Sequence, residues 1–323
     1  MNASPEAGRP PAIALPAHHD SRATIYFALV ANAVIALAKG CAAWFTGSTS
    51  MLAEAVHSLA EAVHSLADCG NQGLLLLGLA RSARPADSEY PLGYGREIYF
   101  WSFIVALMLF SMGGMFSIYE GMHKLAGNAP LKDPWIAIAV LVVSLFAESI
   151  SLSKCLIQVN AARAGQSLWR WFRQTRQSEL LVILGEDIAA TLGLGLALLA
   201  VAVAMATGDP FYDALGSIVI GVLLLIVAVG VGVETKALLV GQSAEPALQR
   251  EISRFLGARA EVAEVLNLIT LQHGAYVVVA VKAHMAERDS VPRMIAAIND
   301  CERALRAAFP QVHWIFFEPD VMA

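Results

Sequence analysis

The stretch AEAVHSLAEAVHSLAD at residues 53–68 decides how the rest of the chain is interpreted. It writes the unit AEAVHSL twice in tandem, and each copy places a histidine four residues before a carboxylate: His57 before Glu61, then His64 before Asp68. Residues four apart lie on one face of a helix, so each pair can direct a nitrogen and an oxygen at one point. The surrounding residues are apolar, which predicts a membrane-spanning helix, where ionisable groups are costly and indicate function. The alternative is an exposed helix end with incidental histidines. It fits less well, because the stretch contains no lysine or arginine.

The composition is typical of a polytopic membrane protein with a soluble part. Of the 323 residues, 57% are hydrophobic and 15% are charged, and the mean hydropathy is +0.59. The apolar residues are clustered, which argues against an ordinary soluble domain. Four cysteines are scattered without a CxxC pair, so the sequence indicates neither a disulfide framework nor a thiolate zinc site. The first 22 residues lack an apolar core, so we expect a short cytoplasmic tail rather than a cleavable signal peptide.

Six apolar segments are long enough to cross a bilayer, which requires about 20 residues each. They lie near residues 25–46, 51–80, 98–120, 134–157, 179–206 and 211–233. Arginines cluster in the N-terminal tail and in the loops after the second and fourth segments, whereas the alternate loops carry only Lys124 and Lys132. The positive-inside rule therefore predicts that both termini are cytoplasmic.

The composition changes near residue 240, and the spans stop there. Helical periodicity over 245–257 and 290–309 and β-branched runs over 262–271, 276–285 and 312–317 predict the order αββαβ. The sequence thus predicts an α-helical membrane protein with six transmembrane helices and a C-terminal cytoplasmic α+β domain. That domain has about 80 residues, which is near the lower size for independent folding, so dimerisation would help it.

Several motifs carry a resemblance to a known family. They are GSTSMLAEAVHSL from residue 47, HSLADCGNQ at 64–72, PLGYGREIYFWSF at 91–103, DPFYDALGSIVIG at 209–221 and FFEPD at 316–320. Together they resemble the cation diffusion facilitator family, and most of all its zinc transporter 9-like branch. The resemblance implies a tail at 1–23, a six-helix membrane domain at 24–238 and a ferredoxin-like domain at 239–323. It also implies a homodimer that exports a divalent metal from the cytoplasm in exchange for protons.

The chain departs from the family pattern at three places. It carries two AEAVHSL units where family members usually carry one. The His-x-x-x-Asp of the fifth span is matched here by Glu186-x-x-x-Ala190, with Asp187 adjacent. The histidine that often precedes Pro-Phe-Gly in the loop after the second span is Tyr90, followed by Pro-Leu-Gly.

The expected metal ligands are His64 and Asp68 from the second span and Glu186 and Asp187 from the fifth. Imidazole with carboxylate suits zinc. Consecutive helical residues diverge by about 100°, so we expect one of the two to face the metal. We favour Glu186, because its spacing to Leu192-Gly193 matches the usual position of the family's histidine, and leave Asp187 open as a ligand or an inter-helix hydrogen-bond partner. A site with more carboxylates than one of two histidines and two aspartates consists of harder ligands, which leaves manganese, iron and cobalt as alternatives.

Other polar residues carry weaker hypotheses. The outer pair, His57 and Glu61, is expected about two turns outward, as a second ligand pair or, as we favour, a polar lining. Asn71 and Gln72 follow Asp68 by one turn and are expected to line the path or to bond between helices. Two further hypotheses concern residues elsewhere in the chain. Asp213 is a candidate for cavity lining or capping, and regulatory metal sites are a hypothesis for His273, His284, His313 and Glu318.

The sequence therefore predicts a proton-coupled exporter of a divalent transition metal, most simply zinc, in which protons compete with the metal for the same ligands. It predicts no enzyme, no prosthetic group and no nucleic-acid partner, and it contains no GxxxxGK[ST] nucleotide motif. The expected partners are a second copy, membrane lipid and protons, in a multi-pass protein of a bacterial inner membrane. The rival hypotheses are a metal-responsive membrane scaffold or regulator and, less well supported, an organic-cation transporter.

Overall fold

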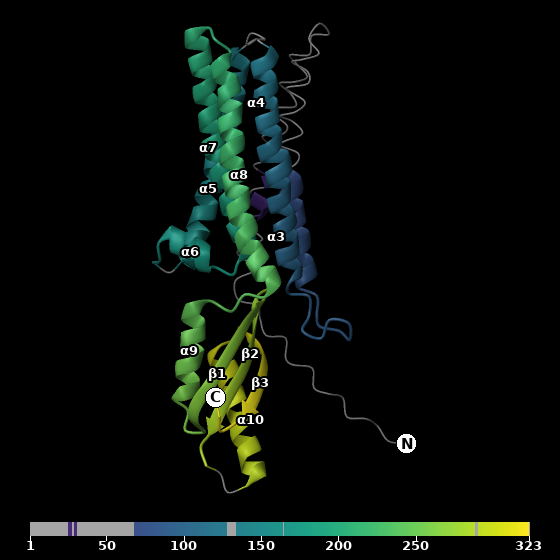
Figure 1. The fold of residues 1–323 in the computed structure, drawn as a ribbon, viewed down its shortest axis with the longest axis vertical. Helices are drawn as coiled ribbons and strands as arrows, with labels where there is room; N and C mark the ends of the chain where they lie inside the picture. Colours follow the sequence, from purple (N-terminus) through teal and green to yellow (C-terminus); the bar gives the residue numbers. More distant parts are fainter. Residues whose placement is uncertain are drawn as a thin grey trace.

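The computed structural model describes residues 25–27, 29–30, 68–127, 134–163, 165–287 and 290–322. It consists of a bundle of long helices with a small mixed α/β domain at one end of the bundle (Figure 1). Most of the first predicted span and the outer part of the second lie outside the described residues. The same holds for His57, Glu61 and His64. The second span is described from residue 68 onward and is helical over 68–82.

Within the described residues, four helical segments are long and apolar enough to cross a membrane. The first is built from α3 (Glu97–Met108), the π-helical η1 (Leu109–Met115) and α4 (Phe116–Gly127), and the others are α5 (Pro134–Ala162), α7 (Ser178–Thr207) and α8 (Phe211–Val240). They correspond to the last four predicted spans. At about 1.5 Å per residue a 30-residue helix is about 45 Å long, so these helices extend beyond a hydrocarbon core of about 30 Å.

Glycines bring the third span and α8 into close contact. A Cβ atom at Gly114 would lie 2.5 Å from Leu225, and one at Gly121 would lie 2.6 Å from Ile218. On the α8 side, a Cβ at Gly221 would lie 2.8 Å from the backbone oxygen of Gly114. Helices in a membrane gain little from the hydrophobic effect, so small residues that allow close backbone approach stabilise their association.

A short helix that the sequence did not predict, α6 (Leu168–Gln174), lies in the connection between α5 and α7 (Figure 1). The hydroxyl of Ser167 caps it by accepting the backbone N–H of Arg170. Its Trp171 is buried, whereas Trp169 is 73% exposed. Arg173 donates to Glu234 over 2.6 Å, which fixes this connection to the last turns of α8.

The C-terminal domain has the predicted order of elements. They are α9 (Pro246–Gly257), β1 (Val262–His273), β2 (Tyr276–Met285), α10 (Val291–Ala308) and β3 (Val312–Pro319). A tight turn at Gly274 makes β1 and β2 antiparallel, and the crossover through α10 makes β2 and β3 parallel. The sheet order is β1-β2-β3. Buried side chains such as Val279, Ile252 and Leu305 form a core between the sheet and the two helices.

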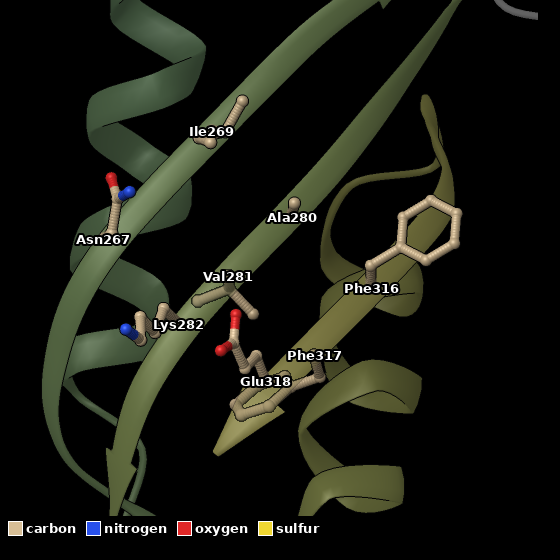
Figure 2. A pocket seen from close by; sticks show the side chains of 8 residues that line it. All are labelled: Asn267, Ile269, Ala280, Val281, Lys282, Phe316, Phe317 and Glu318. Atoms are coloured by element: carbon tan, nitrogen blue, oxygen red, sulfur yellow. The ribbon is translucent and has the colours of Figure 1, made fainter. Parts of the chain in front are cut away.

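The other face of the sheet is open. It holds a shallow pocket of about 190 Å³, whose side chains Figure 2 shows. Ile269 and Phe316 are 59% and 55% exposed there. Lys282 on β2 lies in register with Glu318 on β3, so opposite charges stand side by side on this face.

The tip of the β1–β2 hairpin contacts the first turn of α3 and the loop that precedes it. The hydroxyl of Tyr99 donates to the carbonyl oxygen of Gly274 over 3.2 Å, and Nε2 of His273 lies 3.1 Å from the carbonyl oxygen of Gly93. Burial lowers the pKa of His273, and the guanidinium of Arg96 lowers it further. The neutral imidazole therefore occupies this junction, with Nε2–H as the donor.

We expect Gly95→Ala to loosen the junction between the hairpin and the bundle. A Cβ at residue 95 would lie 2.5 Å from the carbonyl oxygen of His273. Overpacking of this kind typically costs about 1–3 kcal/mol. Thermal unfolding of the purified chain measures the loss. Gly257→Ala is the matched control, because a Cβ there meets nothing within 4 Å, and it should leave the stability unchanged. Equal stabilities of the two variants would mean that the hairpin tip is not held at this position.

Candidate metal centre

The candidate centre lies where α7 packs against the helical residues 68–82. Every residue from Ser178 to Asp187 is buried, so the first turns of α7 are enclosed on all sides. Leu75 and Leu79 belong to the same apolar core as Leu181 and Ile183. The second and fifth spans therefore lie side by side, and polar side chains on α7 at this level face protein and not lipid.

Glu186 faces the second span. Its Oε1 accepts from Nδ2 of Asn71 over 3.2 Å, and its Oε2 accepts from Nε2 of Gln72 over 2.6 Å. Both carboxylate oxygens are thus bound by carboxamides from one neighbouring helix. Each of the two oxygens therefore has its own donor, and the two hydrogen bonds together fix the position of the side chain.

Asp187 faces a different neighbour. Its Oδ2 accepts from the hydroxyl of Ser151 on α5 over 3.2 Å. Consecutive helical residues diverge by about 100°, which is why two adjacent carboxylates contact two different helices. Asp187 has the environment of an inter-helix hydrogen-bond partner, and Glu186 has that of a group directed at the second span.

Asp68 lies one helical turn before Asn71 and Gln72. It is half-buried, and it is close enough to Glu186 for the two carboxylates to interact electrostatically. Carboxylates from two helices at one level can bind a divalent cation that neither would hold alone. His64 precedes Asp68 by four residues and lies outside the described residues, as do His57 and Glu61. Within the described part of the chain, no three His, Cys, Asp or Glu side chains gather into a metal-binding group.

The structure places the remaining candidates elsewhere. Asp213 lies in the first turn of α8 and pairs with Lys124 over 3.0 Å. Among the histidines of the C-terminal domain, His273 lies at the hairpin tip, His313 stacks near Tyr276 and His284 is exposed near the far end of β2. The described residues thus form no shared regulatory site of the predicted kind.

The structure adds Asn71 and Gln72 to the centre. In the sequence they were only polar residues expected to line a path or to bond between helices. The available signal was their spacing of three and four residues from Asp68, which places them on its face of the helix. Their partner could not be identified from spacing, because Glu186 is 115 residues from Asn71 in the chain.

Comparison with known proteins gives consistent matches. A family model described as the cation efflux transmembrane domain matches residues 25–240. The human protein named "Proton-coupled zinc antiporter SLC30A9, mitochondrial" is 34% identical over 218 residues, which cover 66% of this chain and 37% of the human protein. Metal tolerance protein C4 of Arabidopsis thaliana is 30% identical over 240 residues, or 74% of this chain and 51% of that protein. The cation-efflux pump FieF of Yersinia enterocolitica is 27% identical over 295 residues, which cover 90% of this chain and 89% of the Yersinia protein.

The extent of these matches differs. The chain spans well under two thirds of the human and Arabidopsis proteins, whereas it matches nearly the whole of the Yersinia pump. The family model covers the helical bundle that holds Glu186 and the second span.

Proposed function

Because the chain belongs to the cation diffusion facilitator family, whose members are transporters and not enzymes, we propose that it exports a divalent transition metal in exchange for protons. Zinc is the first choice of cargo, since the human relative is named a proton-coupled zinc antiporter. Manganese, iron and cobalt remain alternatives, since a fifth-span glutamate makes the site harder than one with a second histidine.

This proposal rests on one observation, the contact of Glu186 with the second span. Glu186 is buried, bound by two carboxamides of that span and within electrostatic range of Asp68. A buried carboxylate in a membrane bundle is costly unless it has partners and a use. Binding a cation that passes between the two spans is the proposed role of this carboxylate.

In the proposed cycle His64, Asp68 and Glu186 hold the ion after it sheds its water. Asp187 serves as an inter-helix partner. Ligands must be deprotonated to bind a metal, so protons arriving from the other side compete with the ion and release it. Alternating exposure of one site to the two sides then couples outward metal flow to inward proton flow.

The proposed topology has six spans, with residues 24–238 as the membrane domain and 239–323 on the cytoplasmic side. Arg173 lies in a connection at the end of the bundle that faces the C-terminal domain, as do Arg84 and Arg96. The excess of positive charge at this end supports a cytoplasmic location for both termini. The nearly full-length match to the Yersinia pump supports a bacterial inner membrane as the location.

The proposed assembly is a homodimer that covers the open face of the sheet. This face combines exposed Ile269 and Phe316 with the adjacent charges of Lys282 and Glu318. A twofold interface brings the same patch of two subunits together, so the patch must be self-complementary. An apolar surface that carries both signs of charge meets this requirement.

Metal flux into inverted membrane vesicles tests the function. With an imposed proton gradient, the wild-type chain should accumulate zinc, and dissipating the gradient should abolish accumulation. Testing manganese, iron, cobalt and cadmium in the same vesicles identifies the preferred cargo. Binding of metal without flux under any gradient would contradict the proposal and would favour a metal-responsive regulator.

A further inference from the structure

The short helix α6 presents an apolar surface that no described part of the chain covers. Trp169 is 73% exposed and Leu168 is 43% exposed, whereas the neighbouring Trp171 is buried in the core of the bundle. The rings of Trp169 and Phe172 stack in parallel, with their centroids 6.0 Å apart. Trp169 thus extends outward from a side chain that itself packs against the bundle.

The position of α6 along α8 determines its depth in the membrane. Lys124 in the last turn of α4 pairs with Asp213 in the first turn of α8 over 3.0 Å, and this charged pair marks the outer end of the bundle. At about 1.5 Å per residue, Gly230 lies about 26 Å along α8 from Asp213, and Glu234 lies about 32 Å from it. The hydrocarbon core of a bilayer is about 30 Å thick, so its other boundary falls between Gly230 and Glu234.

The helix α6 contacts α8 at this boundary, at the end of the bundle that faces the C-terminal domain (Figure 1). A Cβ atom at Gly230 would lie 3.8 Å from the ring of Phe172, and the guanidinium of Arg173 donates to Glu234 over 2.6 Å. The aromatic side chains of α6 therefore lie at the edge of the hydrocarbon, and Arg173 lies at the level of the headgroups. Tryptophan is enriched at this depth because its ring is apolar and its N–H is polar.

The connection that contains α6 is positively charged. Residues 163–177 include four arginines and no lysine, aspartate or glutamate. Arg163 donates to the neutral oxygens of Asn160 and Gln166, so its charge is not cancelled there. Arg170 is exposed, and it has no ion pair among the described residues. Exposed aromatic and basic side chains on one short helix match the surface of a membrane that contains anionic lipids.

We propose that α6 is an interfacial helix that binds anionic phospholipids of the leaflet on the side of the C-terminal domain. Trp169 and Leu168 lie at the edge of the hydrocarbon, and Arg170 and Arg163 contact the phosphates of the headgroups. A guanidinium suits this role because it can donate two parallel hydrogen bonds to one phosphate. The helix thereby anchors the connection between α5 and α7 to the membrane surface, whatever cargo the protein moves.

Quenching of tryptophan fluorescence by brominated phospholipids tests this proposal on the full-length chain. The chain is reconstituted into vesicles of phosphatidylcholine and phosphatidylglycerol, and each lipid in turn carries the bromine. The difference between the wild type and Trp169→Phe isolates the emission of Trp169. Its quenching per brominated lipid should be about fivefold stronger for phosphatidylglycerol, which is the factor that one arginine near an anionic surface typically contributes.

Two substitutions of arginine identify the source of this preference. Arg170→Gln should remove most of it, while Trp169 remains accessible to both lipids. Arg303→Gln is the matched control, because it removes the same charge from an exposed side chain on α10, and it should keep the wild-type preference. A preference that persists in Arg170→Gln would contradict the proposed headgroup contact.

Two results with the wild type would overturn the proposal. If neither brominated lipid quenches the emission of Trp169, α6 lies outside the membrane interface. If both lipids quench it equally, the arginines select no headgroup. Neither measurement requires metal transport, so this proposal can fail while the export function holds, and the reverse is equally possible.

Discussion

Replacing Asp68 with alanine is expected to abolish metal transport while the protein still folds and associates. Asp68 is the second-span carboxylate that lies within electrostatic reach of Glu186, and His64 is expected to share its helix face. Groups that only support a metal ligand typically contribute about 10–100-fold to affinity or activity. Loss of a direct ligand should therefore reduce transport by more than about 100-fold, and His64→Ala should do the same. Zinc flux into proteoliposomes measures the effect, and size-exclusion chromatography checks folding and association.

The duplicated unit supplies a control for this experiment within the same chain. His57→Ala and Glu61→Ala make equivalent changes one heptad earlier, about 10.5 Å along a continuous helix. As a polar lining, this outer pair should retain most transport when both residues are replaced. If the outer pair proves essential and His64 and Asp68 prove dispensable, the metal site lies one heptad further outward than proposed.

The elements that could be predicted from the sequence are those with a strong local signal. The third to sixth spans follow from long apolar runs, and each predicted range lies close to the observed helix. The order αββαβ follows from periodicity and turn residues, such as the glycine at residue 274 that closes the β1–β2 hairpin. In both cases the interaction that determines the element lies within a few residues of it. For α6, with its buried Trp171, the determining interaction does not lie within a few residues, and the sequence suggested only a loop there.

The parts that could not be predicted depend on contacts between distant residues. Gly114 and Gly121 permit close packing only because α8 lies beside them, and nothing near them in the sequence identifies α8 as the neighbour. Asn71 and Gln72 likewise have an evident helix face but no evident partner. The choice between Glu186 and Asp187 was reached by alignment to a motif, and the structure adds an independent, physical reason for it.

That reason leads to the prediction that Glu186→Gln impairs transport far more than Asp187→Asn. Both substitutions keep the shape of the side chain and remove its charge, so their comparison isolates which carboxylate the cargo needs. Glu186 lies against the second span, bound to Asn71 and Gln72, whereas Asp187 is directed at Ser151 on α5. A glutamine at 186 would also set its NH₂ group against one of the two amide donors, so one of the two hydrogen bonds must be lost or rearranged.

We expect Glu186→Gln to lower zinc flux by more than about 100-fold, because it removes the charge of a proposed direct ligand, and not merely a group that supports one. Asp187→Asn should lower it by less than about tenfold, since an asparagine can still accept the hydrogen bond from Ser151, and a single uncharged bond contributes about 1 kcal/mol. The reverse order would mean that the cargo passes along the α5 side of α7. Equal and large losses would mean that both carboxylates reach the ion, which requires α7 to rotate during transport so that each faces the second span in turn.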